Sequence, residues 1–169
     1  MDDWMRSQVA VMQLHARYVD AVWRKDTAAF GACFATDAQW RLSGFVIDGR
    51  AAIADFMATA FTRYRRILLT FRTPIVDLQD GAISARTYVS EQSVLADGTA
   101  YGPIGTYYER FVEEDGRLRF AWRLFMTEYV GGPDLTGDFY DNPDFGPPPA
   151  MPDPDQPSFN RSGILGSSS

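Results

Sequence analysis

Three Asp-Gly pairs divide the chain beyond residue 66 and constrain its fold more than any other feature. They are Asp80-Gly81, Asp97-Gly98 and Asp115-Gly116, and both residue types tolerate the positive φ angles of tight β-hairpin turns. Segments rich in β-branched residues with alternating polarity lie between them, which is the pattern of half-buried strands. The sequence therefore predicts an antiparallel meander of strands near residues 68–79, 82–95, 100–114 and 117–129.

The first part of the chain has the period of helices instead. Apolar residues of segment 8–24 form two adjoining stripes at helical spacing: Val9, Met12, Ala16, Val19 and Trp23, and Val11, Leu14, Tyr18 and Val22. Only a narrow polar face remains between Gln13 and Arg24, so we expect this helix to be wrapped by protein on most of its surface. Asp26 is a good N-cap for a second, short helix over residues 27–34.

A third helix is expected after a short strand at residues 39–47. Its apolar residues, at helical spacing, are Ile53, Phe56, Met57, Ala60, Phe61 and Tyr64, and the run 63–66 is read as a solvated helix end. Helices grouped before a long antiparallel sheet predict an α+β fold. We expect a curved, mostly antiparallel sheet wrapped around three helices, forming a cone with an internal pocket.

Composition removes several classes of function. The chain has one His (His15), one Cys (Cys33) and one Lys (Lys25), which excludes an internal disulfide or a Cys/His zinc site and makes a Schiff-base lysine improbable. It has no nucleotide-binding glycine motif, so no cofactor or metal is expected. No apolar run is long enough for a membrane span and no signal peptide is visible, so we expect a cytoplasmic protein.

Residues 131–169 differ in composition from residues 1–130. They hold eight of the ten prolines, and their six Asp and one Arg give them −5 of the net charge of −6. A nearly neutral body with an acidic tail argues against nucleic acid as a partner. We predict one domain over 1–130 and a C-terminal arm over 131–169 that lies along the body or a neighbouring subunit of a homo-oligomer. The expected anchors are Leu135, Phe139, Tyr140, Phe145 and Phe159.

Five segments give the chain a resemblance to a known family. They are residues 18–26, 34–40, 49–53, 105–111 and 115–120. Over residues 8–129 the chain resembles the SnoaL-like branch of the nuclear transport factor two-like superfamily, which has a cystatin-like α+β cone. The resemblance implies the cone fold but not one reaction, because the scaffold hosts dehydratases, isomerases, cyclases, lyases, epoxide hydrolases and non-catalytic modules.

Catalytic positions carried over from this superfamily match only in part. Alignment with ketosteroid isomerase places its oxyanion tyrosine on Tyr18, but its general base falls on Leu42 and its second oxyanion donor on Tyr107. The histidine of scytalone dehydratase and of lindane dehydrochlorinase is missing from segment 67–72, although the dehydrochlorinase aspartate falls on Asp26. The chemistry is therefore expected to depart from these versions.

Strand alternation predicts which side chains meet inside the cone. If Tyr107 faces inward, Tyr101 and Glu109 share its face, and Thr87 and Glu91 face inward from the neighbouring strand. An apolar cavity disfavours an ionised carboxylate and a nearby arginine favours a phenolate, so such groups are poised for proton transfer. The predicted catalytic residues are Tyr101, Tyr107, Arg72 and Glu91, and the predicted substrate-binding residues are Tyr18, Trp40, Phe45, Phe61, Tyr64 and Arg123.

Each assignment has a structural alternative. The tyrosines would be ordinary sheet residues, the other aromatic rings would belong to the core, and the carboxylates would be surface groups. Asp26 would serve only as a helix cap, and His15 would be a boundary residue without a partner.

The predicted function is a cofactor-independent lyase or isomerase-type enzyme that acts on a small hydrophobic aromatic substrate. A dehydratase, or a formaldehyde-releasing lyase of lignin-derived diarylpropanes in aromatic compound catabolism, is the specific form that the resemblance implies. A non-catalytic ligand-binding or assembly module of the same fold stays open.

Overall fold

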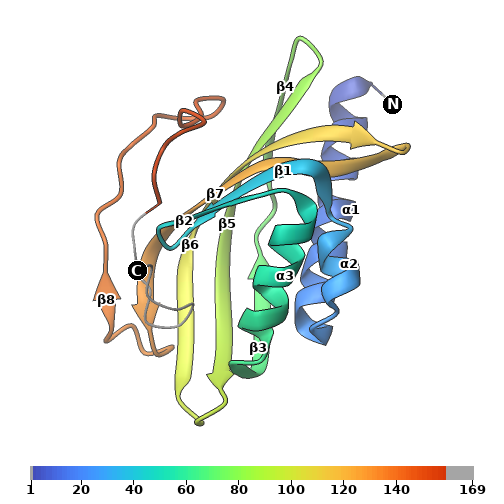
Figure 1. The fold of residues 1–169 in the computed structure, drawn as a ribbon. Helices are drawn as coiled ribbons and strands as arrows, with labels where there is room; N and C mark the ends of the chain where they lie inside the picture. Colours follow the sequence, from blue (N-terminus) through green and yellow to red (C-terminus); the bar gives the residue numbers. More distant parts are fainter. Residues whose placement is uncertain (1, 159–169) are drawn as a thin grey trace.

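A computed structural model describes residues 2–158 and confirms the α+β cone (Figure 1). In chain order the elements are α1 (Asp3–Arg24), α2 (Thr27–Gly31), β1 (Phe34–Leu42), β2 (Phe45–Asp48), α3 (Arg50–Phe61), β3 (Tyr64–Phe71), β4 (Ile75–Gln79), β5 (Ala82–Leu95), β6 (Ala100–Glu114), β7 (Arg117–Gly131) and β8 (Asp138–Phe139). In the described residues, the strands form one curved sheet in the order β2-β1-β7-β6-β5-β3, with β4 on β5 and β8 on β7. Only the β1–β7 pair is parallel.

The turns follow the sequence prediction at two of the three Asp-Gly pairs. Asp80-Gly81 and Asp115-Gly116 both have positive φ at each residue, as a tight hairpin of this kind requires. At the third pair only Gly98 has positive φ, and the Asp97 carboxylate accepts a hydrogen bond from the backbone N–H of Thr99. The loop between β5 and β6 is therefore longer than a two-residue turn.

Two predicted boundaries are wrong around β3. The helix α3 ends at Phe61, and Tyr64 begins a strand instead of continuing the helix, so residues 63–66 are not a solvated helix end. The predicted strand 68–79 is two strands, β3 and β4, separated near Pro74, which has no N–H to donate to a sheet. Both pieces pair with β5, one with each half of it.

The helix α1 begins and ends with clear caps. The Asp2 carboxylate accepts a hydrogen bond from the Met5 N–H, and Lys25 stops the helix in the left-handed conformation. Asp26 then caps α2, as predicted, by accepting from the Ala29 N–H at 2.9 Å. One apolar stripe of α1, which includes Leu14 and Tyr18, is buried against the sheet, but the other stripe is largely exposed. The expectation that α1 is wrapped on most of its surface is wrong.

The core lies between the helices and the concave face of the sheet, and its centre is aromatic. Phe30 and Phe34 are fully buried and contact each other at a centroid distance of 5.3 Å. Trp40 and Tyr18 complete the cluster from β1 and α1. Among the described residues, no helix is both long and apolar enough to cross a membrane.

The tail, taken here as residues 131–158, lies along the opposite face of the sheet (Figure 1). Phe145 and Met151 cover an apolar cluster formed by Tyr108, Trp122, Leu124 and Met126. Main-chain carbonyls of the tail accept hydrogen bonds from side chains of four body residues: Arg41, Arg86, Arg110 and Trp122. The tail therefore contacts the body of its own chain.

The predicted anchors of the tail differ in burial. Tyr140 and Phe145 are half-buried, whereas Leu135 and Phe139 are exposed. The fifth predicted anchor, Phe159, lies outside the described residues. The division into one domain and an arm at residue 130 stays a prediction.

Candidate active site

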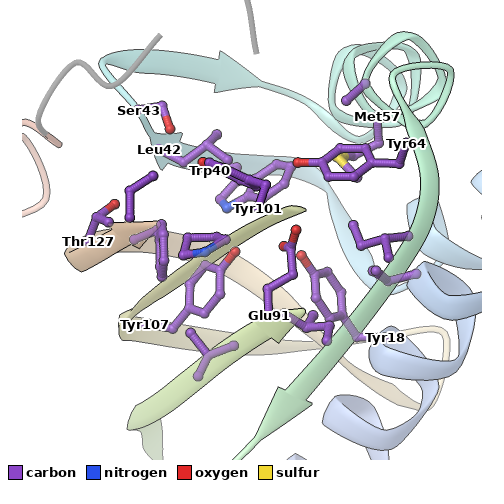
Figure 2. Close-up of a pocket in the computed structure, with 18 residues that line it drawn as sticks. Tyr18, Trp40, Leu42, Ser43, Met57, Tyr64, Glu91, Tyr101, Tyr107 and Thr127 are labelled. Atoms are coloured by element: carbon purple, nitrogen blue, oxygen red, sulfur yellow. The ribbon is translucent and has the colours of Figure 1, made fainter. Parts of the chain in front are cut away.

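A pocket opens between the concave face of the sheet and the helices α1 and α3 (Figure 2). Its empty volume is about 730 Å³, with the open mouth included. Most of its wall is apolar or aromatic, which suits a hydrophobic ligand. The lining residues are Tyr18, Val22, Trp40, Leu42, Ser43, Met57, Ala60, Tyr64, Ile67, Leu69, Val89, Glu91, Tyr101, Pro103, Tyr107, Phe125, Thr127 and Val130.

Glu91 is the one carboxylate among these lining residues. It lies on β5 two residues after Val89, so both side chains point to the concave face. Burial raises the pKa of Glu91 to about 7, although a hydrogen bond from the Ser93 hydroxyl, 2.6 Å from Oε1, acts in the opposite direction. A carboxyl group with this pKa can both accept and donate a proton near neutral pH.

Four tyrosines line the same pocket as this carboxyl group. Tyr64 is close enough to Glu91 and Tyr101 to interact with both electrostatically, and Figure 2 shows the hydroxyls of Tyr18 and Tyr107 directed into the cavity. Burial raises the pKa of Tyr64 and of Tyr107, so both phenol hydroxyls stay protonated and act as hydrogen-bond donors. Burial also raises the pKa of Tyr18, but Arg123 and a hydrogen bond with Tyr107 oppose this effect. The pKa of Tyr18 is still above its ordinary value, so this phenol also stays protonated near neutral pH.

Arg123 lies beneath two of these rings rather than in the pocket wall. Its guanidinium carbon is 3.7 Å from the ring centroid of Tyr107 and 4.3 Å from that of Tyr18. The side chain is fully buried, and its Nε donates a hydrogen bond to Oε1 of Glu109 at 3.0 Å. Arg123 therefore acts on the pocket through the electrostatics and placement of the tyrosine rings.

Glu109 joins Arg123 to His15 in a fully buried polar cluster. His15 Nε2 lies 2.8 Å from Oε2 of Glu109, and the Thr87 hydroxyl donates to the same oxygen at 3.0 Å. Burial alone would raise the pKa of Glu109, but His15, Arg123 and these hydrogen bonds outweigh it and lower the pKa. Because an ionised carboxylate only accepts, His15 Nε2 carries the proton of this hydrogen bond. His15 has a partner, so the expectation of a boundary histidine is wrong.

The structure brings six of the ten predicted site residues into the pocket wall. They are Tyr18, Trp40, Tyr64, Glu91, Tyr101 and Tyr107. Sequence reasoning missed Ser43 and Thr127, which add hydroxyl groups to the pocket wall. Neither residue belongs to a motif. The available signal for Thr127 is its alternation along the strand with Phe125 and Arg123.

Four predicted site residues lie elsewhere. Arg72 is exposed just after β3 ends, because the break before β4 carries it away from the concave face, so it does not supply positive charge to the pocket. Phe61 is core packed against Phe30, and Phe45 packs on Phe56. The fourth, Arg123, is the residue beneath the tyrosines. In residues 2–158 no group of three or more His, Cys, Asp or Glu side chains is placed to hold a metal ion.

Comparisons with known proteins agree with this architecture. A protein from Novosphingobium aromaticivorans provisionally named a scytalone dehydratase is 16% identical, with 79% of this chain and 91% of that chain covered and a TM-score of 0.71. The hexachlorocyclohexane dehydrochlorinase LinA-type3 from Novosphingobium barchaimii is 15% identical, with 82% and 97% covered and a TM-score of 0.69. Aln2 from a Streptomyces species is 27% identical, with 69% and 87% covered and a TM-score of 0.62.

The sequence comparisons identify the family of the chain but match no individual curated protein. No curated protein sequence matches the chain. The structural likenesses at 15% and 16% identity show the fold alone, a fold shared by dehydratases and dehydrochlorinases. The model of the SnoaL-like domain matches residues 5–124, which is most of the body, and the chain belongs to the family of SnoaL-like domains.

Proposed function

We propose that this pocket is the active site of a cofactor-independent lyase or isomerase-type enzyme that acts on a small hydrophobic, aromatic substrate. The observation that carries the proposal is Glu91, a carboxyl group with a pKa of about 7 in a pocket whose other side chains are apolar, aromatic or hydroxyl-bearing. Perturbed titration inside a cavity is typical of acid–base residues. The fold is compatible with this function, because dehydratases and dehydrochlorinases share it.

In the proposed mechanism Glu91 moves the proton and the phenols position the substrate. The rings of Trp40 and Phe125 would contact an aromatic substrate, and the hydroxyls of Tyr101 and Tyr107 would donate hydrogen bonds to its oxygen atoms. Tyr18, held above Arg123, would stabilise negative charge that develops on such an oxygen. None of these steps requires histidine.

Two reactions fit these roles with a balanced transfer of protons. In a dehydration, Glu91 removes a C–H proton, the electron pair forms a C=C bond, and the departing hydroxyl leaves as water with a proton returned from the site. In a diarylpropane diol, Glu91 removes the O–H proton of the hydroxymethyl group. The C–C bond to the hydroxymethyl carbon then breaks to release formaldehyde, and its electron pair forms the C=C bond of a stilbene. The benzylic hydroxyl is expelled and leaves as water with the proton taken by Glu91.

The test is a screen of aromatic diols and hydroxy ketones with formaldehyde release and C=C absorbance as readouts. For a substrate that is turned over, Glu91→Gln should lower kcat by about 100-fold or more, the scale of a positioned acid–base group. Glu113→Gln, which removes an exposed carboxylate of β6, is the matched control and should leave kcat unchanged.

The pH profile gives a second, independent readout. Glu91 must be ionised to accept a proton, so kcat/KM should rise with pH and level off above about pH 7. Full activity of Glu91→Gln would show that another group is the base. Tight binding of these compounds without turnover would instead favour a non-catalytic ligand-binding module.

A further inference from the structure

The side chains of Asn142 and Ser158 connect the tail to the main chain of the body. Asn142 Nδ2 donates a hydrogen bond to the Thr127 carbonyl at 2.8 Å, and Ser158 Oγ accepts one from the Gly44 N–H at 3.0 Å. These contacts differ from those of the tail carbonyls, because they need an amide that donates or a hydroxyl that accepts. They therefore identify tail positions at which the type of side chain matters.

Ser158 holds the turn between β1 and β2. Leu42 pairs with Phe45, so Ser43 and Gly44 form a two-residue turn, and both have positive φ. The Gly44 N–H lies outside the ladder, and the buried Ser158 accepts its hydrogen bond. In Figure 1 the last coloured part of the tail ends beside this turn. Because serine adopts positive φ less readily than glycine does, a contact from outside the hairpin favours this conformation.

Arg41 reinforces the same contact from β1. Its Nη1 donates hydrogen bonds to the carbonyls of Asp155 at 3.0 Å and Gln156 at 3.3 Å. The next two residues, Leu42 and Ser43, line the pocket. Since neighbouring strand residues face opposite sides of a sheet, the tail binds one side of this segment and the pocket lies on the other. The position of the pocket wall here depends on the end of the tail.

Asn142 holds a bulge in β7. The pairing of β6 with β7 shifts by one residue at Glu128, which is left outside the regular ladder. The Tyr140 N–H donates to the Glu128 carbonyl at 2.9 Å, next to the contact between Asn142 and Thr127. Bulges beside active sites commonly redirect a side chain. The tail therefore stabilises the irregular stretch of β7 from which Thr127 enters the pocket wall.

We propose that the tail is part of the active site, with Asn142 and Ser158 as positioning residues for two hydroxyls of the pocket wall. These hydroxyls belong to Ser43 and Thr127, and Figure 2 shows both residues on the side of the pocket away from Tyr18. Serine and threonine hydroxyls both donate and accept hydrogen bonds, as a phenolic hydroxyl does. This inference rests on the proposed function, and it specifies an aromatic substrate with a phenolic hydroxyl at this end.

Binding of two probes that differ by one hydroxyl tests the proposal without turnover. The probe para-hydroxystilbene has one phenolic hydroxyl, and para,para′-dihydroxystilbene has one at each end. Fluorescence titration of each probe with the full chain gives its Kd. The second hydroxyl should tighten binding to the unmodified protein about 10-fold, the scale of one hydrogen bond. Asn142→Ala and Ser158→Ala should each remove most of this gain and leave the Kd of para-hydroxystilbene nearly unchanged.

Further variants separate positioning from loss of the fold. Ser158→Thr keeps a hydroxyl and should keep the gain from the second hydroxyl of the probe. Thr136→Ala removes a tail hydroxyl that donates to Asp134 within the tail, and it should also keep the gain. Ser43→Ala should lower the gain as much as Ser158→Ala does, and the double variant should lose no more, because Ser158 acts through the turn that carries Ser43.

This test and the test of the proposed function fail separately, because binding of the probes does not require proton transfer by Glu91. A substrate whose turnover survives Glu91→Gln would contradict the proposed base and leave the binding result standing. The inference is overturned if the second hydroxyl adds no affinity in the unmodified protein, or if Asn142→Ala and Ser158→Ala both keep the gain. Equal weakening of both probes would also overturn it, because that result would indicate a general loosening of the pocket.

Discussion

Replacement of Glu91 by glutamine should stabilise the protein at alkaline pH. The carboxyl has a pKa of about 7 in the folded protein, against an ordinary value of 4.5 that applies to the unfolded chain. Each pKa unit corresponds to about 1.4 kcal/mol, so the ionised Glu91 costs the folded state about 3 kcal/mol once both states are fully ionised. This is a large part of the 5–15 kcal/mol by which domains are typically stable.

The direction in which stability changes with pH follows from the number of protons that the folded and unfolded states bind. Between pH 4.5 and about 7 the folded protein holds a proton on Glu91 that the unfolded chain has released, so stability falls as pH rises through this window. Glutamine has nearly the same shape, stays neutral, and its carbonyl oxygen can accept the Ser93 hydrogen bond. Glu91→Gln and the unmodified protein should therefore be about equally stable near pH 4.5 and differ by about 3 kcal/mol, with the variant more stable, near pH 8.5.

Urea denaturation followed by tryptophan fluorescence at several pH values measures this difference. Glu113→Gln removes an exposed carboxylate and should give no such pH-dependent gain. A Glu91→Gln variant that is no more stable than the unmodified protein at alkaline pH would refute the reasoning, because it would mean that water solvates the carboxylate in the pocket.

Three further predictions concern other parts of the molecule. Tyr101→Phe and Tyr107→Phe should keep the fold, and at least one should lower turnover by about 100-fold or more on an identified substrate; full activity of both would exclude a role for these hydroxyls. Glu109→Gln should destabilise the protein by about 3–5 kcal/mol in chemical denaturation, because it leaves the buried Arg123 charge uncompensated. Truncation after Val130 should lower the melting temperature, because it uncovers the apolar cluster around Trp122; unchanged melting would show that the tail adds no stability.

The fold was predictable where the signal was local. The turns at Asp80-Gly81 and Asp115-Gly116 depend on two adjacent residues, and the cap at Asp26 depends on one carboxylate and the amide three positions later. The boundary at Tyr64 was not predictable from period alone, because the residue continues the apolar spacing of the helix while its backbone already belongs to β3. Pro74 was the available signal for the break between β3 and β4, since proline rarely lies inside a paired strand.

The pocket wall was predictable only in part. Alternation along β5 and β6 correctly places Glu91, Tyr101 and Tyr107 on the concave face, because one inward residue fixes every second neighbour. The hydrogen bond between His15 and Glu109 joins residues 94 positions apart on different elements, and it depends on how α1 packs across the sheet. No local pattern contains that information, although a glutamate at an inward position requires a buried partner.

The tail is bound mainly through its own backbone. Arg41, Arg86, Arg110 and Trp122 all donate to main-chain carbonyls of the tail, a group that every amino acid carries. The body therefore dictates the path of the tail while leaving most of its side chains unspecified. Most residues of the tail can therefore be substituted without changing its path, provided that a few apolar contacts such as those of Phe145 and Met151 are kept. Chimaeras with an unrelated proline-rich tail of equal length and the same two apolar positions should fold with the tail along the same route.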